Sequence, residues 1–172
     1  VLFLESIKPL VRILEFSLLA ILIIHTVNAL KITLSNKKAN NIKYNYNAQS
    51  ETSTFNSRTM AISGSIILLF LIIHLSYIWY TYRTMNGHDY FKVLLQNKIG
   101  FLGHLPTSIF YIISIILISF HLQHGFQSAL KTFGITKQHK LGILYNIAIF
   151  FWAIIPLGFI LIIIAIQLGF IA

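Results

Sequence analysis

The chain has 172 residues, of which 56% are hydrophobic and only 10% are charged. Soluble domains carry about 25% charged residues, so this composition indicates an integral membrane protein. The absence of cysteine excludes disulfides, thiolate metal sites and cysteine-ligated iron–sulfur clusters on this chain. The net charge is +9, and the basic residues lie mostly in short segments beside apolar runs. Basic residues in such positions set the orientation of membrane helices, so the charge does not argue for nucleic-acid binding.

Four apolar runs are each long enough to cross a bilayer as a helix, at about 11–34, 58–82, 106–130 and 141–171. They predict an all-α transmembrane helical bundle that forms a single membrane-anchor domain over residues 1–172. Pro106 suits the first turn of the third span, whereas Pro156 inside the fourth span predicts a kink. Arg12 and Glu15, three residues apart, predict an interfacial ion pair on one face of the first span.

The basic residues are unevenly divided between the two sides of this bundle. The first and third loops hold eight, namely Lys31, Lys37, Lys38, Lys43, Arg58, Lys131, Lys137 and Lys140. The N-terminus and the second loop hold five, namely Lys8, Arg12, Arg83, Lys92 and Lys98. Because basic loops stay on the inner side of a membrane, we expect loops one and three on the cytoplasmic or matrix side.

Histidines lie inside three of the four apolar runs, at positions His25, His74, His121 and His124. An ionisable residue in a membrane span usually faces the interior of the bundle and marks a functional site. Two imidazoles on facing helices can occupy both axial positions of a haem iron, an arrangement that suits electron transfer. The alternative is that these histidines only form hydrogen bonds between helices.

The depth of each histidine follows from its distance to the nearest flanking charge, at about 1.5 Å per helical residue. His25, His121 and His124 lie about 9, 15 and 10 Å from the lysines of loops one and three. His74 lies about 13 Å from the basic start of loop two, on the other side. His25 can therefore share a haem with His121 or with His124, whereas His74 has no partner of matching depth.

Small and basic residues near these histidines fit the same cofactor. Gly64 in the second span and Gly125 in the third would let a flat macrocycle approach the helix backbone. Arg58 and Lys131 lie at the cytoplasmic ends of these spans, where they would pair with haem propionates. The sequence thus predicts a haem site between the first, second and third spans.

Four segments carry a resemblance to a known family, namely Asn36–Ala39, Ser57–Met60 with Ser63–Gly64, His121–Gly134 (HLQHGFQSALKTFG) and Ile155–Phe159. On these segments the chain resembles the cytochrome b membrane anchor of succinate dehydrogenase and fumarate reductase. The form it resembles is the single-subunit, two-haem type of the Bacteroidetes-like branch. The resemblance covers nearly the whole chain, and HGFQSAL is its specific block.

This resemblance implies five spans, of which the first four each supply one haem-ligating histidine. The first span here corresponds to the family's second, so His25 and His121 would hold the proximal haem b iron and His74 the distal one. His121 is chosen because the family's ligand precedes the glycine by four residues, which leaves His124 beside the haem or its propionates. Ser119 stands where some members have an acid linked to a proton route, so we do not expect that route here.

The family's first span has no counterpart among the four spans. The resemblance therefore implies one haem b, or two if the missing helix is supplied by a further small membrane subunit or by a segment outside this sequence. With a single haem, His25 and His121 would hold it and His74 would be structural.

The function that the resemblance implies is that of the membrane anchor of succinate:quinone oxidoreductase, or complex II, of the respiratory chain. The chain would dock the flavoprotein, which carries FAD, and the iron–sulfur subunit, and would pass electrons between iron–sulfur clusters and membrane quinone. The succinate-oxidising site would belong to those partners. Candidate quinone contacts at the membrane boundary are Ser57, Arg58 and Lys131.

The expected location is a bacterial cytoplasmic membrane or a mitochondrial inner membrane. Two alternatives stay open at this point. One is another bis-histidine cytochrome b that reacts with quinone, such as a subunit of a nitrate reductase or hydrogenase. The other is a structural membrane anchor or transporter without haem, whose histidines only join helices.

Overall fold

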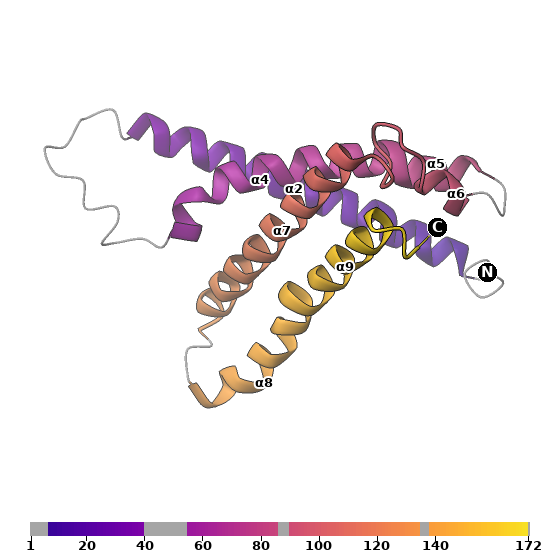
Figure 1. Ribbon diagram of the computed structural model, residues 1–172. Coiled ribbons are helices and arrows are strands. Elements are labelled where there is room, and N and C mark those ends of the chain that lie inside the picture. Colours follow the sequence, from indigo (N-terminus) through magenta and orange to yellow (C-terminus); the bar gives the residue numbers. More distant parts are fainter. Residues whose placement is uncertain (1–6, 40–54, 86–89, 135–137, 172) are drawn as a thin grey trace, which may run out of the picture. The chain divides into compact units, whose positions relative to one another are not determined.

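The computed structural model describes residues 7–39, 55–85, 90–134 and 138–171, and every regular element within these ranges is helical (Figure 1). Four helical stretches are long and apolar enough to cross a membrane, at Lys8–Ala39, Arg58–Thr84, Leu105–Thr132 and Leu144–Gln167. The predicted all-α class is confirmed for the described residues, as is the presence of four helices long and apolar enough to span a membrane. The fourth stretch ends before the predicted position 171 because Gly169, at φ +73°, closes the helix.

Helix α2 (Lys8–Ala39) belongs to the first of two units, Val1–Thr52. Pro9 lies in its first turn, where a missing backbone N–H costs little, and no proline or glycine interrupts the helix afterwards. Arg12 Nη1 donates to Glu15 Oε2 at 2.8 Å, which confirms the predicted ion pair.

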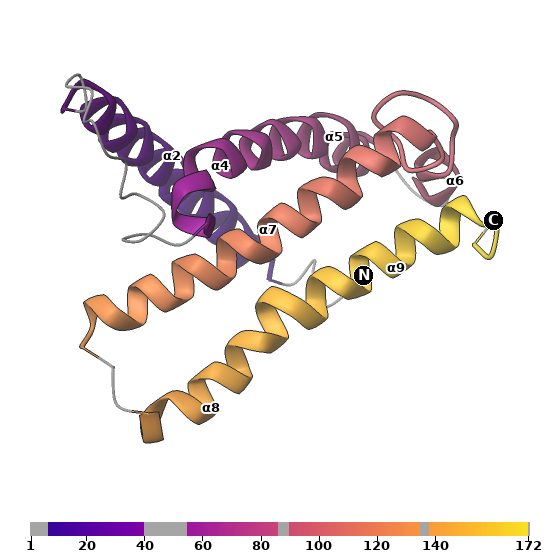
Figure 2. The same cartoon turned by 60° about the vertical axis from the view of Figure 1, so that its left-hand side comes forward.

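The second unit, Ser53–Ala172, contains the other helices, and α7 (Leu105–Thr132) is central among them. Helix α7 packs along α4 on one side and along α9 on the other (Figures 1 and 2). Pro106 lies in its first turn, as predicted. The remaining elements in chain order are α4 (Phe55–His74), the π-helical turn η1 (Leu75–Trp79), α5 (Tyr80–Thr84), α6 (Tyr90–Leu94), α8 (Gln138–Ile149), the π-helical turn η2 (Phe150–Ile154) and α9 (Ile155–Gln167).

The core of this unit is small and lies where α4, α7 and α9 meet. Its buried apolar residues are Phe70, Tyr111, Ile115 and Ile163. Ser114 on α7 is fully buried and donates its hydroxyl to the carbonyl of Phe110, one turn earlier. Small hydroxyl residues let membrane helices approach closely, and here they satisfy their own polarity within the helix.

Hydrogen bonds join the segment before α7 to the ends of two helices. Gln167 Nε2, at the end of α9, donates to the Leu102 carbonyl at 2.6 Å and to Ser108 Oγ at 3.0 Å. Ser108 Oγ donates to the same Leu102 carbonyl at 2.6 Å. The Gly100 N–H donates to Thr107 Oγ1 at 3.1 Å. The bonds of Gln167 hold the start of α7 against the end of α9.

Gly100 gives the first prediction. Its φ is +93°, and an added Cβ would lie 2.3 Å from the Tyr77 ring, so Gly100→Ala creates both backbone strain and a clash. We expect the variant to lose about 1–3 kcal/mol of stability, measured as a lower midpoint of thermal unfolding in detergent.

Gly158→Ala is the matched control for this measurement. Gly158 is helical, and an added Cβ there would meet no atom within 4 Å. Alanine in a helix is favoured over glycine by about 1 kcal/mol, so this variant should keep or raise the midpoint. Equal midpoints for the two variants would contradict the prediction.

Candidate functional site

Two of the four histidines in the apolar runs lie along the contact between α4 and α7, which run antiparallel. At one end His121 faces Gly64, and a Cβ added to Gly64 would lie 3.8 Å from His121 Cε1. His74 lies ten positions after Gly64 on α4, and Tyr111 lies ten positions before His121 on α7. His74 faces Tyr111, and the centroids of their rings are 6.1 Å apart. Ten helical residues span about 15 Å, so the two histidines lie at different depths of the same contact.

His74 is half-buried, and its Nδ1 atom has no hydrogen-bond partner among the described residues. A buried polar atom left without a partner costs about 1–3 kcal/mol, so Nδ1 is an unfavourable feature of this helix contact. His74 is also the last residue of α4 before the π-helical turn η1. Such turns occur frequently at functional sites, because they change the direction of the side chains that follow.

His121 is half-buried on α7, and its Nδ1 atom is shielded from solvent. A Cβ at position 64 would make an ordinary van der Waals contact with this imidazole, so the contact does not require glycine there. His124 lies one turn later on α7 and is also half-buried. Gly125 is exposed, and an added Cβ there would meet no atom within 4 Å, so the surface of α7 beside it is open.

The other predicted site residues lie at the ends of these helices or in the first unit. Arg58, near the start of α4, and Lys131, in the last turn of α7, are both exposed at the same end of the antiparallel pair as His121. Ser57 is in the first turn of α4, and its side chain lies outside the described residues. His25 is exposed on α2 within the first unit, so its pairing with His121 or His124 stays a prediction.

Among the described residues there is no cluster of three or more histidine, cysteine or acidic side chains that would hold a metal ion. A haem requires less from the protein, since one or two axial side chains suffice and the porphyrin supplies the other four ligands. The residues of α4 and α7 fit such a group better than they fit a bare ion. They offer separate imidazoles at two depths, one of them with an unsatisfied nitrogen.

Ser119 has a role that the sequence did not reveal. Its hydroxyl donates a hydrogen bond to the backbone carbonyl of Trp152, in η2. Pro156, four residues after Trp152, has no N–H and cannot serve that carbonyl as a normal helical residue would. Helix-breaking prolines are tolerated in membrane spans when a neighbouring hydroxyl satisfies the freed backbone group, and Ser119 does so here. The π-helical turn η2 lies directly before Pro156, where the sequence predicts a kink.

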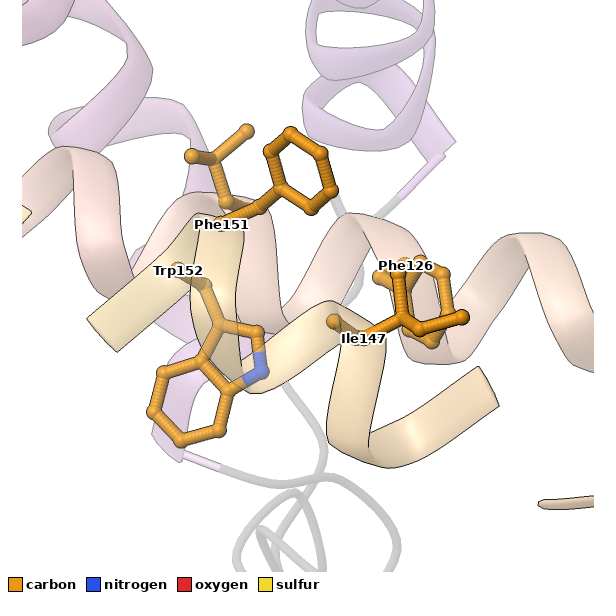
Figure 3. Close-up of a pocket in the computed structure, with 6 residues that line it drawn as sticks. Phe126, Ile147, Phe151 and Trp152 are labelled. Atoms are coloured by element: carbon orange, nitrogen blue, oxygen red, sulfur yellow. The ribbon is translucent and has the colours of Figure 1, made fainter. Parts of the chain in front are cut away.

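A small apolar pocket of about 180 Å³ lies between α7 and the α8–η2 segment (Figure 3). Figure 3 shows Phe126 and Ile147 on one side of the pocket and Phe151 with Trp152 on the other. Its lining has no titratable side chain, and its α7 residues lie on a different face from His121. The pocket therefore suits hydrocarbon and has no group for proton transfer. Its lining residues are Leu122, Phe126, Ile147, Ala148, Phe151 and Trp152.

Comparison with known proteins adds no further support for a function. No protein-family model matches the chain. No curated protein and no solved structure matches it either. The functional argument therefore depends on the residues and the geometry described above.

The bond from Ser119 to Trp152 gives the second prediction. Ser119→Ala leaves the Trp152 carbonyl without its donor, and we expect a loss of about 0.6–1.7 kcal/mol, between the average and the maximum measured for hydrogen bonds between membrane helices. In a Pro156→Ala background the helix regains an N–H for this carbonyl, so Ser119→Ala should cost less there. Thermal or denaturant unfolding of the four variants of this cycle measures the difference.

Ser114→Ala is the control, because the Ser114 hydroxyl bonds to a carbonyl of its own helix. It should lower stability less than Ser119→Ala does. A cost of Ser119→Ala that is the same with proline or alanine at position 156 would contradict the explanation.

Proposed function

We propose that this chain is a haem b-binding membrane anchor of succinate:quinone oxidoreductase. The observation that carries the proposal is the pair of histidines along the contact between α4 and α7. His121 lies against Gly64, and His74 has a buried nitrogen that no described residue satisfies. Both lie inside helices apolar enough to cross a membrane. The HGFQSAL block supports the same proposal through the family resemblance.

In this proposal each residue has a distinct task. His121 of α7 and His25 of α2 supply imidazoles to one haem iron, and His74 supplies one at the other depth. Haem, when bound, carries one electron at a time within the membrane. Gly64 lies against the His121 imidazole, and the surrounding apolar side chains exclude water. Arg58 and Lys131 neutralise propionates at the membrane boundary.

The soluble partners dock on the side that carries loops one and three. The flavoprotein with FAD and the iron–sulfur subunit would meet basic residues there, and charge complementarity would favour their association. Lys37 and Lys38 form the last turn of α2 on that side. Quinone would bind at the same boundary near Ser57, Arg58 and Lys131. The protein would act in a bacterial cytoplasmic membrane or a mitochondrial inner membrane. A further helix would complete the site at His74 if a second haem is bound.

The experiment that tests this proposal is a haem count on the chain purified from its own membranes, together with the masses of all co-purifying chains. A pyridine haemochrome assay should give one or two haem b per chain, with a flavin-carrying dehydrogenase and an iron–sulfur protein present. One haem assigns it to His25 and His121, and two require another helix opposite His74. Absence of haem would overturn the proposal in favour of a structural anchor or transporter. Haem with a different partner would indicate another quinone-reactive cytochrome b.

The third prediction distinguishes the two histidines of α7. His121→Ala should remove one haem per complex, because it deletes an axial ligand. His124→Ala should leave that haem six-coordinate and low-spin, because His124 is not a ligand in the proposal. Reduced-minus-oxidised spectra and haem content measure both effects. The reverse result would assign the ligand to His124.

A further inference from the structure

The imidazole of His74 lies against two aromatic rings. Phe70, one turn earlier on α4, stacks on it with ring centroids 5.6 Å apart and planes 27° apart. Tyr111 approaches from α7, with centroids 6.1 Å apart and planes 51° apart. The imidazole therefore packs beside a pair of rings, one from its own helix and one from the facing helix.

These two rings are themselves firmly placed. Phe70 and Tyr111 are buried members of the core, and Tyr111 is only 3% exposed. They meet edge to face, with centroids 4.9 Å apart and planes 77° apart, a favoured geometry for aromatic pairs. Phe110 lies against Tyr111 in the same manner, at 6.3 Å and 71°. Rotation of either ring would disturb the centre of the α4–α7 contact.

A metal-bound histidine is usually oriented by a hydrogen bond from its second ring nitrogen to a carbonyl or carboxylate. The described residues give His74 Nδ1 no such bond. The plane of the imidazole is instead set by the stacking ring of Phe70 and by Tyr111 behind it. Aromatic packing thus performs at His74 the task that a hydrogen bond performs at most metal-bound histidines.

We propose that Phe70 and Tyr111 are positioning residues that fix the plane of the His74 imidazole for axial binding to a haem iron. This inference rests on the proposed function. The orientation of an axial imidazole sets the splitting of the d orbitals of low-spin ferric iron, and therefore the g values of its electron paramagnetic resonance signal. An imidazole that loses its stacking ring adopts a different or broader range of orientations, and the g values follow.

The experiment uses the haem-loaded complex purified with its partners. The signal to follow is the one that disappears in His74→Ala. Phe70→Leu keeps an apolar side chain but removes the flat ring, so we expect the highest g value of that signal to shift or broaden. Tyr111→Leu should have the same effect. Tyr111→Phe keeps the ring and removes only the hydroxyl, so it should leave the signal unchanged. The signal that depends on His121 should not move in any of these variants.

Ile115→Ala is the control for general loosening of the core. Ile115 is a buried member of the same cluster, one turn after Tyr111 on α7. Its truncation removes core packing without removing a ring, so the signal that depends on His74 should keep its g values. Haem content measured in every variant separates loss of the cofactor from a change in its geometry.

The outcomes separate this inference from the function on which it rests. Unchanged g values in Phe70→Leu and Tyr111→Leu, with haem retained, would overturn the positioning role and leave the anchor proposal intact. The same would follow if Ile115→Ala moved the signal equally, or if no signal depended on His74. Complete absence of haem in the unmodified complex would overturn both proposals.

Discussion

Polar groups inside an apolar helix must find partners within the protein, because the hydrocarbon of a bilayer offers none. Several polar side chains of the second unit meet this constraint. The hydroxyl of Ser114 bonds to its own helix, and the hydroxyl of Ser119 serves the carbonyl that Pro156 cannot. The side-chain amide of Gln167 donates a hydrogen bond to the Leu102 carbonyl. The Nδ1 atom of His74 differs from these groups, because no described residue pairs with it.

The two ends of α7 are built differently. All of its buried residues lie between Thr107 and Ile115, where hydrogen bonds from Gln167 and close contact with α4 hold the first half of the helix. After Ile115 the side chains of α7 are half-buried or exposed, and this half carries His121, His124 and Lys131. A cofactor and the helix that completes it need accessible helix surface. The half of α7 that carries His121 is the more accessible one in the described unit.

Sequence reasoning succeeded where one strong local signal decides the structure. Long apolar runs gave the four helices, and a spacing of three residues gave the ion pair between Arg12 and Glu15. It failed where two distant segments decide together. Pro156 predicts a backbone carbonyl that lacks its helical donor. The sequence spacing does not reveal that the Ser119 hydroxyl, on another helix, donates a hydrogen bond to that carbonyl. Depth along a helix follows from flanking charges, whereas the face that His74 or His121 presents depends on how α4 and α7 pack.

The packing of His74 also bears on why aromatic residues occupy this part of the contact. A neutral imidazole has one donor nitrogen and one acceptor nitrogen, so a ring that gives one nitrogen to iron must place its N–H on the other. At His74 the Nδ1 atom faces a region where the described chain offers no acceptor, and only flat rings lie beside it. An imidazole without that hydrogen bond donates less electron density to a bound metal than one whose N–H is paired. The same aromatic surroundings that would orient His74 would therefore also make it a weaker ligand than an imidazole whose N–H is bonded.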